Sequence, residues 1–107
     1  MFAHAHNLAG PSVTAFIRIE TPGGQRVREE VLPRIGDVQL SLPPGRYRLS
    51  SYRRTCAGSC SAGRLSATEQ GSCARLIVLA PGQTVFVHVL VAPAGPCGML
   101  IDPSGAG

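Results

Sequence analysis

The four cysteines, Cys56, Cys60, Cys73 and Cys97, are the residues of this 107-residue chain whose spacing bears most directly on chemistry. They lack the paired C-x2-C knuckles of a zinc ribbon. In a short chain with 13 glycines and 9 prolines, four cysteines predict two disulfides rather than a four-cysteine zinc site or free thiols. Three pairings are possible, among them Cys56–Cys73 with Cys60–Cys97, and the sequence alone leaves the choice open.

The three histidines offer metal binding as a second possible chemistry. His4 and His6 could chelate a metal, but we expect both to lie in a flexible amino-terminal segment, residues 1–10. His88 lies on the strand face opposite a row of valines, where we expect a partly covered surface histidine. The prediction is therefore no metal site and no cofactor.

The permanent positive charges are all arginines: ten arginines against six acidic residues give a net charge of +4. Arg46, Arg48 and Arg54 can share one strand face with Tyr52, because side chains of a strand point to alternating faces. Guanidinium groups bind phosphate or carboxylate with two hydrogen bonds, and tyrosine adds a stacking surface. This arginine stripe predicts a site for an anionic ligand. The alternative is a solvated strand face whose charges discourage edge-to-edge aggregation.

Catalysis has few candidate residues in this sequence. It contains no G-x-S-x-G elbow, no H-E-x-x-H and no cysteine–histidine signature. The adjacent Glu29 and Glu30 would point to opposite faces of a strand, so they do not form a carboxylate pair. We expect no enzyme. We also expect no nucleic-acid binding, because no aromatic-rich or glycine-loop RNA-binding motif occurs.

Apolar residues alternate with a period of two along most of the chain, and no helical period is evident. The predicted strands span about 13–19, 27–32, 38–42, 46–54, 74–79, 84–91 and 97–101. Val85, Val87, Val89 and Val91 form the most regular core face. Short strands divided by proline- and glycine-rich turns predict an all-β fold, a seven-stranded antiparallel sandwich of the Greek-key type.

The length predicts a single domain, in which residues 11–102 form the sandwich and 103–107 a flexible tail. If successive strands reverse direction, the loops that carry the cysteines fall at one end, so we expect both disulfides there. No run approaches the roughly 20 apolar residues of a transmembrane helix. We expect a monomer.

The cysteine usage predicts an extracellular or cell-surface location, because disulfides persist in oxidising compartments. The first seven residues have neither the charged nor the apolar region of a signal peptide. We therefore expect an export signal upstream of the given sequence, the alternative being a cytosolic protein.

The segment Leu42-Pro43-Pro44-Gly45-Arg46-Tyr47-Arg48-Leu49 resembles a hairpin of the transthyretin-like (prealbumin-like) sandwiches, which include carboxypeptidase regulatory-like and collagen-adhesin B-type domains. The segment Ala80-Pro81-Gly82-Gln83-Thr84-Val85 resembles their second hairpin. The resemblance implies a spacer, accessory or adhesion domain and no reaction. The isopeptide bond of many adhesin domains needs a lysine, and this chain has none. The Cys56/Cys60 region, with the two later cysteines, also resembles small exported actinobacterial proteins of unassigned role.

Together these features predict a non-catalytic structural or interaction module of the cell surface or extracellular space, with a protein partner that the sequence does not specify. The alternative is a binding module that uses the arginine stripe to hold an anionic wall polymer, a lipid headgroup or an acidic protein.

Overall fold

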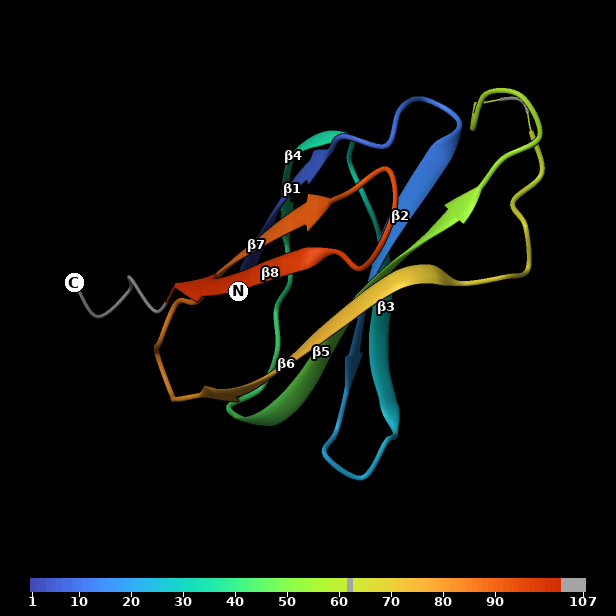
Figure 1. Ribbon diagram of the computed structural model, residues 1–107. Coiled ribbons are helices and arrows are strands. Elements are labelled where there is room, and N and C mark those ends of the chain that lie inside the picture. Colours follow the sequence, from blue (N-terminus) through green and yellow to red (C-terminus); the bar gives the residue numbers. More distant parts are fainter. Residues whose placement is uncertain (62, 103–107) are drawn as a thin grey trace.

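The computed structural model describes residues 1–61 and 63–102 and contains eight β-strands. They are β1 (Phe2–Asn7), β2 (Val13–Glu20), β3 (Arg26–Leu32), β4 (Ile35–Gln39), β5 (Gly45–Thr55), β6 (Gln70–Leu79), β7 (Phe86–Val91) and β8 (Gly98–Asp102). Sheet A has the strand order β4-β1-β7-β8 and sheet B the order β3-β2-β5-β6. Figure 1 shows the two sheets as facing layers. Among the described residues there is no helix that could span a membrane.

The predicted all-β sandwich is confirmed, with eight strands instead of seven. The additional strand is β1, so the prediction of a flexible segment over 1–10 is corrected: most of that segment belongs to sheet A. There β1 pairs antiparallel with β4 and parallel with β7, and the sandwich is therefore not antiparallel throughout. The inward side chains of β1 are the small Ala3 and Ala5, and alanine is a weak strand former. The predicted tail, 103–107, lies outside the described residues.

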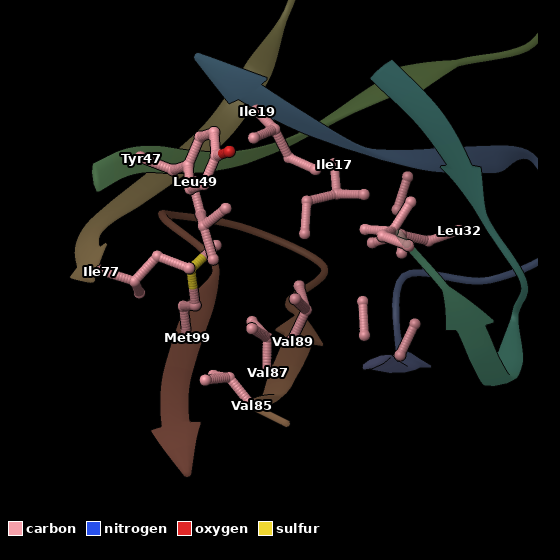
Figure 2. Packing of buried hydrophobic residues seen from close by; sticks show 14 of the residues in the cluster. Ile17, Ile19, Leu32, Tyr47, Leu49, Ile77, Val85, Val87, Val89 and Met99 are labelled. Carbon is pink, nitrogen blue, oxygen red and sulfur yellow. The ribbon is translucent and has the colours of Figure 1, made fainter. Parts of the chain in front are cut away.

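The hydrophobic core lies between the sheets. Ile17 and Leu49 come from sheet B, Val87 and Val89 come from sheet A, and all four are buried. Figure 2 shows side chains from the two sheets pointing toward one another. Burial of an aliphatic side chain of this size contributes about 1.5–3 kcal/mol. The predicted valine face of β7 is confirmed as core, and it extends from Val85 to Val91.

The turn before β5 determines where that strand begins. The Tyr47 hydroxyl donates a hydrogen bond to the Pro43 carbonyl at 2.5 Å, which ties the strand back to the turn. Gly45 has a φ of 156°, a conformation that residues with a side chain rarely adopt. A side chain at this position would only touch the Tyr47 ring at ordinary contact distance, so the backbone conformation rather than lack of space favours glycine here. The position of the arginines that follow depends on this turn.

Two disulfides join Cys56 to Cys60 and Cys73 to Cys97. The structure thus selects a pairing other than Cys56–Cys73 with Cys60–Cys97. Cys56 follows the end of β5 and Cys73 lies near the start of the antiparallel β6, so the bridges lie at one end, as predicted. The second bridge connects the two sheets, and its sequence separation of 24 residues corresponds to about 3.5 kcal/mol on a loop-entropy argument.

Candidate functional site

The predicted arginine stripe lies on the outer face of β5, in sheet B. Arg46, Arg48, Tyr52 and Arg54 alternate with inward residues such as Leu49, so the prediction of a shared face is confirmed. Their surroundings differ along the strand, however. Tyr52 and Arg54 lie within a network of aromatic and charged side chains, whereas Arg46 and Arg48 lie at the opposite end of the strand and face solvent.

Tyr52 is covered by its neighbours and is only 2% exposed. Its ring stacks on Phe16 of β2, with 5.2 Å between centroids and 9° between planes. The guanidinium carbon of Arg18 lies 4.7 Å from the Tyr52 ring centroid, and that of Arg54 lies 5.5 Å away. Such contacts stabilise the fold through stacking and cation–π attraction. The structure therefore corrects the prediction that Tyr52 offers a ligand a stacking surface.

Arg18 is the centre of this network, although no pattern in the sequence marks it as a site residue. Its guanidinium donates one hydrogen bond to Glu29, at 2.8 Å, and two to Glu69, at 2.8 Å and 3.3 Å. A further bond, at 3.3 Å, reaches the Tyr52 hydroxyl. The bonds to Glu69 and Glu29 raise the pKa of Arg18, so its charge is held in place between two carboxylates.

The same contacts lower the pKa values of the two carboxylates. The hydrogen bond from Arg18, with a second from Arg54, lowers the pKa of Glu69. Burial acts to raise the pKa of Glu29, but the hydrogen bond and charge of Arg18 outweigh it, and this pKa is also lowered. Both acids are thus ionised partners of the network.

Arg54 belongs to this network as well. It bonds to Glu69 at 3.3 Å, and its guanidinium carbon lies 5.5 Å from the Phe16 ring centroid. Its Nε is buried and has no hydrogen-bond partner in the part of the chain that the structure describes. The charge of Arg54 is therefore neutralised by a neighbour and partly covered, unlike a charge displayed for a ligand.

Arg46 and Arg48 differ in each of these respects. Both are exposed, and within residues 1–61 and 63–102 neither forms an ion pair. The register pairs Arg46 with Val78 and Arg48 with Leu76 of β6, and cross-strand partners have adjacent side chains. Leu76 is 75% exposed and Val78 is 65% exposed. We call Arg46, Arg48, Leu76 and Val78 the basic–aliphatic patch.

The basic–aliphatic patch borders a shallow pocket of about 270 Å³ at the Pro22 end of the sandwich. Arg46 and Arg48 are two residues apart on one face, so their backbones are about 6–7 Å apart along the strand. Two guanidinium groups at this spacing can bind neighbouring phosphates or carboxylates. The aliphatic side chains beside them would lose contact with water when a partner covers them.

The histidines form a second group, on the outer face of sheet A. His4 and His6 lie on β1, within an ordered strand, and His88 on β7 is the register partner of His4. The ring centroids of His4 and His88 are 6.0 Å apart. Nδ1 of His4 lies 2.7 Å from Oδ1 of Asp37, a hydrogen bond between β1 and β4. In the described ranges, no group of three or more His, Cys, Asp or Glu side chains is arranged to hold a metal ion.

The chain matches no protein-family model and no curated protein sequence. Its structure is similar to the crystal structure of transthyretin from Sparus aurata, with a TM-score of 0.55 over 94% of this chain and 96% of that one. The sequences are 14% identical over this match, and a similarity at that level shows the fold alone. The protein thus has a transthyretin-like fold, as the hairpin motif implies. The narrower resemblances to carboxypeptidase regulatory-like domains and to actinobacterial exported proteins rest on sequence motifs only.

Proposed function

We propose that this protein is a non-catalytic interaction module of the extracellular space or cell surface, and that the basic–aliphatic patch binds an anionic partner. One observation carries the proposal. Arg46 and Arg48 are exposed without an ion pair among the described residues, whereas Arg18 and Arg54 on the same sheet face are held by acids.

The disulfides support the proposed location. Two intact bridges are compatible with an oxidising compartment such as the cell exterior. The sequence also has no G-x-S-x-G, H-E-x-x-H or cysteine–histidine motif, and we assign the protein no reaction.

Protection of a sheet edge is a weaker explanation for the exposed arginines. In the strand order β3-β2-β5-β6, the arginines lie on the interior strand β5, and β6 is the edge strand. A charge that prevents aggregation is needed on the edge itself. Here the exposed outward side chains of that edge include Leu76 and Val78, which are apolar. The patch therefore combines accessible charge with accessible apolar area.

The composition of the patch favours a partner that presents anionic groups next to apolar ones, as an anionic phospholipid surface does. Exposed arginine charges are screened within about 8 Å at physiological salt, so binding should weaken as ionic strength rises. Each arginine near such a surface contributes about 1 kcal/mol. Loss of both Arg46 and Arg48 should therefore weaken binding about 30-fold.

The test is co-sedimentation with phosphatidylglycerol vesicles at low and high salt, with phosphatidylcholine vesicles as the uncharged comparison. The test variant is Arg46→Ser/Arg48→Ser. The matched control is Arg34→Ser/Arg64→Ser, which removes the same charge from exposed positions elsewhere. We expect the first pair to lose vesicle binding and the control to keep most of it. Equal retention of the two variants, or binding that does not change with salt, would contradict the proposal.

A further inference from the structure

A second binding site lies on the outer face of the other sheet, and it uses none of the residues of the basic–aliphatic patch. We propose that His4 and His88 together bind a divalent transition-metal ion of the zinc, nickel or copper class. The two histidines come from opposite ends of the chain, and the parallel pairing of β1 with β7 brings them together.

The distance between the two imidazole rings suits a shared ion. A Zn–N bond of about 2.0–2.1 Å places each ring centroid roughly 3 Å from the metal, so two rings on one ion have centroids at most roughly 6.5 Å apart. The His4 and His88 centroids are 6.0 Å apart, and their planes are tilted by 60°. Binding then needs side-chain rotations that direct one nitrogen of each ring to a common point.

A hydrogen bond to Asp37 orients the His4 ring for metal binding. The Asp37 carboxylate accepts the Nδ1 hydrogen bond of His4 at 2.7 Å. That bond leaves the lone pair of His4 Nε2 available for a metal, and it is the carboxylate–histidine arrangement that orients the ligands of many metal sites. The His4 side chain is 44% exposed, so an ion can reach it from solvent.

One cross-strand row contains all the parts of this site. Following sheet A from β4 to β8, the row is Asp37, His4, His88 and Leu100. Three adjacent strands thus supply the supporting carboxylate and the two imidazoles. The strands β1 and β7, which carry the two histidines, are interior strands held by backbone hydrogen bonds on both sides, so the spacing of the ligands is set before an ion arrives.

The row opens into a shallow pocket of about 350 Å³, which is also lined by His6, Arg75 and Leu90. Arg75 brings a positive charge to the rim, which opposes the binding of a cation, and its Nε donates a hydrogen bond to the Met99 carbonyl at 3.2 Å. Two neutral imidazoles favour zinc, nickel or copper over calcium or magnesium, which prefer oxygen ligands. Water would complete the coordination in the open pocket.

His6 provides an internal control. It lies on the same face of β1, but its register partners are Ile35 and Leu90, so it belongs to the next row. The proposed site needs only His4 and His88. His6 is more exposed than His4 and lines the same pocket, but because it lies outside the row it should contribute little.

The experiment is isothermal titration of the tag-free, disulfide-bonded protein with zinc chloride, with imidazole nitrogen shifts followed by NMR. The variants are His4→Gln, His88→Gln, Asp37→Asn and, as the control, His6→Gln. We expect one ion per chain and shifts at both His4 and His88. Each of the two ligand variants should weaken binding by at least tenfold, Asp37→Asn by about tenfold, and the control by less than about threefold.

Thermal unfolding in EDTA checks that the variants are folded, and a surface substitution should leave the melting temperature nearly unchanged. Arg46→Ser/Arg48→Ser should bind zinc like the wild type, so failure of the proposed function leaves this inference intact. Absence of zinc binding by the wild type would overturn it. So would unchanged affinity in both His4→Gln and His88→Gln, or a loss in His6→Gln as large as theirs.

Discussion

The outer face of sheet B has two halves that use the same residue type differently. In one half, Arg18 and Arg54 lie over aromatic rings and are bonded to Glu29 and Glu69. In the other half, Arg46 and Arg48 of β5 face solvent beside aliphatic side chains. We call these the paired half and the open half.

The difference between the halves comes from neighbouring segments. Strand β3 supplies Glu29 to the paired half, and the loop just before β6 supplies Glu69. In the open half the cross-strand partner of Arg48 on β2 is Glu20, but within the described residues the two form no ion pair. The position of an arginine on a strand thus decides which way it points, and the acids that surround it decide whether its charge is available.

The largest effect should come from the core beneath both halves. Leu49 lies on the inner face of β5, is fully buried and supports the strand from which the arginines project. Leu49→Ala should reduce the free energy of unfolding by about 2–5 kcal/mol, measured by urea denaturation. A loss below about 1 kcal/mol would mean that this strand is not packed as described.

The two halves themselves should differ in their contribution to stability. Arg18→Ala removes hydrogen bonds to two carboxylates and uncovers the Tyr52 ring. We therefore expect the free energy of unfolding to fall by about 1.5–3 kcal/mol. Arg48→Ala should change stability by no more than about 0.5 kcal/mol, because its side chain is exposed and forms no ion pair in the described part of the chain. Equal losses of unfolding free energy in Arg18→Ala and Arg48→Ala, measured by urea denaturation, would contradict the distinction between the halves.

Acidification should act on the paired half. The pKa values of Glu29 and Glu69 are lowered in the folded protein, so their stabilising contribution is complete above the unfolded value of about 4.3 and is lost as the pH falls through the folded values. Melting temperatures from pH 7 to pH 2.5 should show the gap between wild type and Arg18→Ala narrowing below about pH 4. A gap that stays constant over this range would show that these ion pairs do not contribute.

The smallest effect should come from the aliphatic side of the open half. Leu76→Ser/Val78→Ser removes exposed apolar area without changing the charge. We expect binding to phosphatidylglycerol vesicles to weaken about threefold to tenfold, less than for the arginine pair. Unchanged binding in the co-sedimentation assay would limit the site to its arginines.

Much of the fold could be predicted from the sequence, because strand alternation is a local property. The period of two identified seven of the eight strands, although the strand predicted over 38–42 lies at Ile35–Gln39 in the structure. It also assigned Val87 and its neighbours to the core and placed Arg46 and Arg48 on one outward face. The cysteines fell at one end because strand reversal determines where the loops lie. The strand β1 was missed because its inward residues are alanines, which give a weak signal.

Only the tertiary structure decided which segments lie beside one another, and the chemistry of the surface depends on that. The alternation of β5 cannot show that Glu69 would neutralise Arg54, or that Phe16 and Arg18 would cover Tyr52. The disulfide pairing has the same origin, and so does the meeting of the first and last histidines. Apart from the bridge between Cys56 and Cys60, which are four residues apart, each of these contacts joins residues far apart in the chain. Their pairing follows from the packing of the eight strands rather than from any local pattern.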